Sequence, residues 1–73
     1  MEYQGVLRIR LLRQAKGLTQ EEVAHALAMR QPTYSFLESG RLRPSKRQVS
    51  LLEAYFGEPV EKLLKPWKPR KEG

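Results

Sequence analysis

Residues 16–45, KGLTQEEVAHALAMRQPTYSFLESGRLRPS, carry the clearest helix signals in the chain. Thr19 and Glu22 form a capping box, in which each side chain satisfies a backbone N–H that the first helical turn leaves unpaired. Pro32 suits the first turn of a second helix, where its missing N–H has no intrahelical partner. Gly40 readily adopts the left-handed conformation of a helix C-cap. This punctuation predicts helices over about 20–27 and 31–39, joined by a turn of about three residues.

Helix signals continue on both sides of this segment. Val6, Ile9, Leu12 and Ala15 form an i, i+3 repeat of apolar residues. This repeat predicts a first helix over about 3–16, ending at Gly17. A second capping box, Ser45 with Gln48, begins a fourth helix that stops at Gly57. A short fifth helix starts at Pro59 and buries Val60, Leu63 and Leu64. Since we find no strand-like alternation, the chain is predicted to be all-α, a compact bundle of five short helices.

The 73 residues make one small domain, which we assign to residues 1–64. Residues 65–73, KPWKPRKEG, are basic and proline-rich and indicate a C-terminal tail. The chain has no cysteine, which excludes disulfides and thiolate metal sites. Its apolar runs are too short to span a membrane, and residues 1–12 lack the features of a signal peptide. We therefore expect a cytoplasmic location.

The charge is banded along the chain rather than mixed. The net charge is +6, and residues 1–20, 21–40, 41–50, 51–64 and 65–73 carry +3, −2, +4, −2 and +3. Such banding indicates a polyanionic partner. The chain also lacks asparagine and aspartate and is rich in lysine and arginine, a pattern reported for heat-adapted proteins.

Catalytic groups are not clustered in the sequence. His25 is the single histidine, and without a cysteine or aspartate nearby it has no partners for a triad or a metal site. Glu21 and Glu22 are adjacent, so their side chains point in different directions. The glycines are dispersed helix caps rather than a phosphate-binding loop. We expect no enzyme activity, no cofactor and no metal.

Residues 16–45 resemble the phage repressor/Cro-type (XRE-type) helix-turn-helix family. The features that carry the resemblance are the GLTQEE opening, the Leu-Glu-x-Gly close and the basic loop that ends in Pro-Ser. The resemblance extends over about residues 6–64. It implies a lambda-repressor-like DNA-binding fold and a transcriptional regulator of double-stranded DNA, with repression by occlusion of polymerase as the simplest role.

The resemblance places the helix over 31–39 in the DNA major groove, which is wide enough for one α-helix. Gln31 can then bond an adenine, and Arg30 a guanine or a phosphate. Phe36 has three interpretations, which are contact with a thymine methyl group, contact with a protein partner, or exposure without a role. Tyr34 is expected in the core. The residues implied to contact bases are Arg30, Gln31, Pro32, Thr33 and Phe36.

Phosphate contacts are implied at the start of the helix over 20–27 and in the loop after residue 39. The resemblance points to Thr19, Gln20, Ser39, Arg41 and Arg43, and the local cluster of positive charge adds Lys46 and Arg47. It also implies a structural ion pair between Arg13 and Glu38.

A homodimer on a pseudo-palindromic operator is expected, because a single helix reads too few base pairs to be specific. We assign its interface to the fifth helix and the tail, at Leu63, Leu64, Pro66 and Trp67. The alternatives are a monomer, and an interaction module that uses the same fold to bind a protein. The chain departs from the family pattern at several positions. Among them, Ala28 replaces the turn glycine, and Leu7 with Leu11, one turn apart, would form an exposed apolar stripe.

Overall fold

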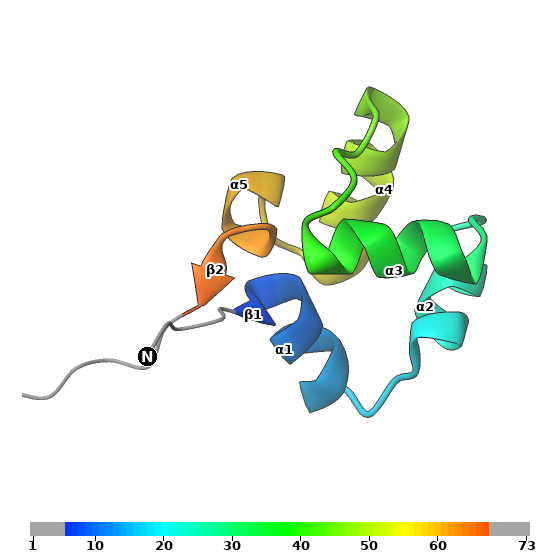
Figure 1. Cartoon of the computed structure of the whole chain (residues 1–73), viewed down its shortest axis with the longest axis horizontal. Helices are drawn as coiled ribbons and strands as arrows, with labels where there is room; N and C mark the ends of the chain where they lie inside the picture. Colours follow the sequence, from blue (N-terminus) through cyan, green and yellow to red (C-terminus); the bar gives the residue numbers. More distant parts are fainter. Residues whose placement is uncertain (1–5, 68–73) are drawn as a thin grey trace, which may run out of the picture.

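The computed structural model describes residues 6–67, and within them the chain forms five helices and two short strands (Figure 1). The helices are α1 (Arg8–Ala15), α2 (Gln20–Ala26), α3 (Gln31–Ser39), α4 (Lys46–Phe56) and α5 (Val60–Leu63). In Figure 1, α3 runs across the middle of the molecule, with α2 at its N-terminal end and α1 and α4 on opposite sides. The predicted bundle of five short helices is confirmed.

The first helix is shorter than predicted, and the sequence did not predict a pair of two-residue strands beside the helices. Helix α1 begins at Arg8, while β1 (Val6–Leu7) pairs antiparallel with β2 (Pro66–Trp67). The pairing is extended by a hydrogen bond from Arg8 N to Lys65 O at 3.1 Å. Helical periodicity cannot detect such a strand, because two residues are too few to show an alternation and the partner lies at the other end of the chain. The remainder of the predicted start, residues 3–5, lies outside the described residues.

The predicted capping boxes are confirmed at both helices. The backbone N–H of Glu22 donates to Thr19 Oγ1 at 3.0 Å, and that of Thr19 donates to Glu22 Oε1 at 2.8 Å. Ser45 and Gln48 exchange the equivalent bonds at the start of α4. These bonds pair donors that a helix start leaves free, so local sequence alone determines where α2 and α4 begin.

The hydrophobic core lies where all five helices meet. Its fully buried side chains include Ile9 from α1, Tyr34 from α3 and Leu63 from α5. The predicted exposed stripe of Leu7 and Leu11 is wrong, because both side chains are half-buried and Leu7 packs against the core. Leu7 belongs to β1 rather than to α1, so the helical i, i+4 spacing does not apply to this pair.

Two contacts that the sequence did not predict hold the ends of the bundle together. Arg8 donates to both carboxylate oxygens of Glu58, at 2.7 and 2.8 Å, and so joins the start of α1 to the turn between α4 and α5. Glu53 Oε2 accepts the backbone N–H of Val60 at 2.8 Å, which satisfies one of the free donors at the start of α5.

Candidate nucleic-acid interface

Helices α2 and α3 form a compact pair connected by the turn over residues 27–30. Helix α2 ends in a Schellman motif, in which Ala28 N donates to His25 O at 3.1 Å and Met29 N donates to Ala24 O at 2.9 Å. This motif requires a left-handed residue, and Ala28 supplies it at φ 57°. The turn leaves the first residue of α3 beside α2, where Gln31 Nε2 donates to Gln20 Oε1 at 2.7 Å.

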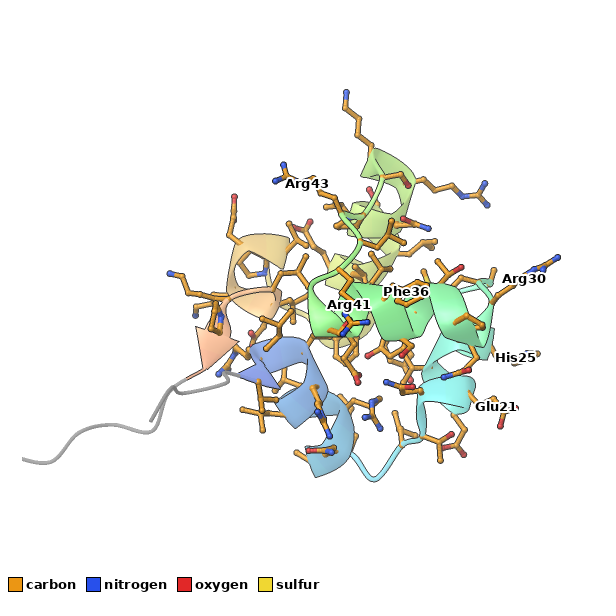
Figure 2. The ribbon with its side chains drawn as sticks, in the orientation of Figure 1. Glu21, His25, Arg30, Phe36, Arg41 and Arg43 are labelled. Carbon is orange, nitrogen blue, oxygen red and sulfur yellow. The ribbon has the colours of Figure 1, made fainter. Side chains whose placement is uncertain are left out.

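The outer face of α3 carries the residues predicted to contact bases. Arg30, Gln31 and Pro32 are exposed, Thr33 is half-buried, and the Phe36 side chain is 48% exposed. Pro32 lies in the first turn, as predicted, and Arg30 makes no capping hydrogen bond with its side chain within residues 6–67. Figure 2 shows Arg30 extending from the N-terminal end of α3 and Phe36 on the helix itself. The inner face buries Tyr34, Leu37 and Glu38.

The residues predicted to contact phosphates lie in two groups. Thr19 and Gln20 are at the N-terminus of α2, where Thr19 Oγ1 accepts its capping bond and keeps a hydroxyl proton to donate. The other group follows α3 and is exposed: Ser39, Arg41, Arg43, Lys46 and Arg47. Ser39 Oγ already donates to Phe36 O at 3.1 Å. Figure 2 shows Arg41 and Arg43 on the loop after α3, with Arg41 nearer to that helix.

Beneath this face, Arg13 of α1 and Glu38 of α3 form a buried ion pair. Arg13 Nε donates to Glu38 Oε2 at 2.6 Å, and Nη2 donates to Oε1 at 3.2 Å. Arg13 Nη1 also donates to Leu18 O at 2.6 Å, in the loop before α2. The pair therefore joins α1 to α3, as the resemblance implied, and Arg13 also bonds the α1–α2 loop.

Glu38 stays ionised although it is buried. Burial by itself raises the pKa of its carboxyl group, but hydrogen bonds from Arg13, Gln20 and Tyr34 outweigh burial and lower the pKa below its ordinary value. Tyr34 Oη donates to Glu38 Oε2 at 2.7 Å. Burial of the phenol raises its pKa most, and this hydrogen bond raises it further. Tyr34 is thus a neutral donor to a charged acceptor.

The ion pair continues to the surface through two glutamines. Gln20 Nε2 donates to Glu38 Oε1 at 2.8 Å, and Gln31 Nε2 donates to Gln20 Oε1 at 2.7 Å. The chain of bonds runs from the core to the first residue of α3. The sequence did not predict this chain of hydrogen bonds. Gln20 and Gln31 begin separate helices, so their contact depends on how α2 and α3 pack.

The predicted dimer residues divide by burial. Leu63 has no exposed surface and belongs to the core, so it has none to offer a partner. Leu64 is half-buried and Pro66 is exposed, and the contact predicted for the Trp67 side chain lies outside what the structure describes. An open groove of about 720 Å³ lies beside Leu64, and it is lined by Leu7, Leu42, Val49, Val60, Glu61 and the loop over 40–44.

Other kinds of site are not found among the described residues. Within residues 6–67, histidine and acidic residues do not gather in a group of three that could hold a metal ion. Over the same range, the longest helix is far too short and polar to cross a membrane.

Comparison with known proteins places the chain in a class. The sequence profile of the helix-turn-helix family (HTH_3) matches residues 9–63, which is most of the chain, and domains of this kind are DNA-binding modules rather than enzymes. The chain belongs to this helix-turn-helix family, and the resemblance to its repressor/Cro type is confirmed. It is also similar to a protein of Archaeoglobus fulgidus described as an uncharacterized HTH-type transcriptional regulator. The two are 39% identical over 56 residues, covering 77% of this chain and 80% of that protein.

Proposed function

We propose that this protein is a sequence-specific transcriptional regulator that places the exposed N-terminal half of α3 in the major groove of double-stranded DNA. The observation that carries the proposal is the exposed set of Arg30, Gln31, Pro32 and Phe36 on one helix, supported from beneath by a buried ion pair. A major groove accepts one α-helix, whose first residues meet the base edges. In this arrangement Gln31 bonds a base, while Pro32 and Phe36 contact thymine methyl groups.

The phosphate contacts flank α3 on both sides. Thr19 and Gln20 bind one phosphate at the N-terminus of α2, where the helix dipole favours an anion. Arg41 and Arg43, with Lys46 and Arg47 beyond them, bind phosphates on the other side, since residues 41–50 carry +4. Ser39 joins this set when its hydroxyl releases the Phe36 carbonyl.

The protein acts as a homodimer on a pseudo-palindromic operator. Because Leu63 is buried, the interface moves to Leu64, Pro66 and the adjoining groove, whose apolar lining includes Leu42 at 39% exposure. Two protomers then place their α3 helices about one turn of DNA apart. Bound in this way in the cytoplasm, the dimer blocks polymerase and represses transcription.

A protein-binding role is the second candidate, favoured by the exposure of Phe36 and Leu42. Large apolar side chains exposed together mark surfaces where proteins meet. The two functions differ in their dependence on salt. DNA affinity falls with a log–log slope of about −0.9 for each phosphate neutralised, whereas an apolar protein interface responds far less.

The decisive experiment is selection of DNA from a random pool, repeated with Gln31→Ala and Arg43→Ala. Wild-type protein should enrich one motif. Gln31→Ala should relax the preference at one base pair, at about 1–3 kcal/mol. Arg43→Ala should weaken all sequences alike. If wild-type protein enriches no motif at low salt, the DNA-binding proposal is wrong and protein binding takes its place.

A further inference from the structure

We propose that a hollow between the β1–β2 ribbon and the C-terminal end of α3 binds a phosphate of the DNA backbone, held between Arg10 and Arg41. The resemblance implies a phosphate contact for Arg41 but assigns none to Arg10, so this site adds α1 to the elements that contact DNA. The inference rests on the proposed function, because the phosphate belongs to the DNA that α3 reads.

The hollow has a volume of about 290 Å³ and is bounded by three parts of the chain that are distant in sequence. The ribbon supplies Val6–Leu7 and Pro66, and α1 supplies Arg10. The end of α3 and the loop after it supply Ser39 and Arg41. In Figure 2, Arg41 lies at the C-terminal end of α3, next to the start of α1. The pairing of β1 with β2 therefore brings the two ends of the domain beside the residues that follow α3.

Two arginine side chains open onto this hollow without an acidic partner among the described residues. Arg10 and Arg41 are both exposed, and neither takes part in the ion pairs found within residues 6–67. Glu38 also borders the hollow, but it is buried and its carboxylate is already bonded to Arg13. Two neighbouring cations repel each other in the free protein, so an anion between them is favoured.

The donors around the hollow suit a phosphate group. Each guanidinium presents its N–H groups in a planar fork with no acceptor, an arrangement that bonds two phosphate oxygens at once. The hydroxyl of Ser39, which donates to Phe36 O at 3.1 Å, lies on the same wall as Arg41. The apolar atoms of Val6–Leu7 and Pro66 keep water from the opposite wall, which strengthens the attraction between charges.

A phosphate in this hollow would set the orientation of the whole domain on DNA. Arg10 precedes Arg13 by three positions, so the two side chains project from the same side of α1. Arg13 bonds Glu38, and Glu38 borders the hollow that Arg10 lines. A phosphate held between Arg10 and Arg41 thus fixes α1 and α3 to the backbone together. Such contacts carry no sequence information, but they determine the angle at which a recognition helix enters the groove.

The first measurement is the salt dependence of operator binding. Arg10→Met keeps the apolar stem and removes the charge. The log–log salt slope should flatten by about one unit, and affinity at about 100 mM salt should fall about tenfold for every sequence alike. Lys62→Met, at an exposed position of α5, removes the same charge outside the proposed interface and is the matched control. It should keep the wild-type slope.

The second measurement locates the phosphate. Each phosphate of the operator is replaced in turn by a neutral methylphosphonate, and the loss of affinity is compared between wild type and variants. At one position the replacement should weaken wild type about tenfold but Arg10→Met less than about twofold, because the contact is already lost. Arg41→Met should lose its sensitivity at the same position. Arg43→Met should keep it, since Arg43 borders a different groove.

A third readout needs no DNA. Inorganic phosphate added to the free protein should shift the NMR signals of the Nε–H groups of Arg10 and Arg41 together, and Arg10→Met should abolish the shift at Arg41. Signals that do not shift, an unchanged salt slope in Arg10→Met, or a scan in which Arg10→Met keeps every wild-type sensitivity would each overturn the inference. If phosphate shifts both signals but wild-type protein enriches no DNA motif, the proposed function fails and the hollow binds a free anion instead.

Discussion

Glu38 is a buried charge whose partners come from α1, from α2 and from its own helix α3. Replacing Arg13 with methionine keeps the apolar stem but leaves the carboxylate without its counter-ion. We expect the free energy of unfolding to fall by about 3–5 kcal/mol, because an uncompensated charge remains in the core. Urea unfolding measures the loss, and Arg10→Met, at an exposed position of α1, provides the control. A loss of less than 1 kcal/mol would mean that the pair is not an important support of the fold.

Arg13→Met should also reverse the way in which pH changes the contribution of Glu38 to the free energy of unfolding. In the wild type the folded-state pKa of Glu38 is lowered, so its stabilising contribution is complete above the unfolded-state pKa of about 4.3 and is lost as pH falls through the folded-state pKa. In Arg13→Met burial should raise this pKa, so that stability is lost as pH rises instead. The difference in unfolding free energy between the two proteins should therefore widen between about pH 3 and about pH 6. A constant difference over this range would contradict the assignment of the charge to Glu38.

Phe36 separates binding from folding at a single position. Because its side chain is 48% exposed, Phe36→Ala should change the free energy of unfolding by less than about 1 kcal/mol. Under the proposed function the variant should bind the selected operator about tenfold more weakly and lose a thymine preference at one position. Calorimetry and competition binding measure the two effects. An unchanged operator affinity would leave Phe36 to a protein partner or to no role.

At the scale of an element, the turn between α2 and α3 stores backbone strain at Ala28. A left-handed conformation costs an alanine about 1–2 kcal/mol, and glycine adopts it freely. Ala28→Gly should therefore stabilise the protein by about 0.5–1 kcal/mol after the extra entropy of the unfolded chain is deducted. Ala54→Gly, at an exposed position within α4, should destabilise it by about 1 kcal/mol. Thermal unfolding should show the opposite signs, and destabilisation by both changes would rule out strain at Ala28.

At the scale of the whole molecule, the banded charge sets how DNA affinity responds to salt. Arg43→Ala should flatten the log–log salt slope by about one unit, because one phosphate contact is lost. Lys62→Ala, at an exposed position of α5 to which the proposal assigns no phosphate, should leave the slope close to that of wild type. Fluorescence anisotropy from about 50 to about 200 mM salt measures both. Equal slopes in wild type and Arg43→Ala would remove this arginine from the interface.

The proposed dimer is tested by mass and stoichiometry. Leu42→Glu places a charge in the apolar groove and should prevent two protomers from binding one operator, while leaving the fold intact because Leu42 is exposed. Analytical ultracentrifugation with operator DNA should report two protomers for wild type and one for the variant. One protomer per operator in wild type would support the monomer.

Whether a contact could be predicted from the sequence depends on how far apart its two residues lie along the chain. The caps at Thr19 and Ser45 join residues three positions apart, so the sequence predicted them with their partners. The bond between Gln20 and Gln31 joins residues 11 apart, and the Arg8–Glu58 pair joins residues 50 apart. The sequence had no means to match these partners, since each has many polar alternatives at similar separations. Arg13 and Glu38 were matched only because the family pattern implied them.

By itself the sequence determined that five helices form, the capping boxes at Thr19 and Ser45, and the bands of charge, because each depends on residues within a few turns of one another. Only the tertiary structure decided that Val6–Leu7 pairs with Pro66–Trp67, that Leu63 is buried, and that two hydrogen bonds link Glu38 through Gln20 to Gln31. These features arise where separate elements meet, and the donors, acceptors and surfaces that meet there are brought together by folding rather than by order along the chain.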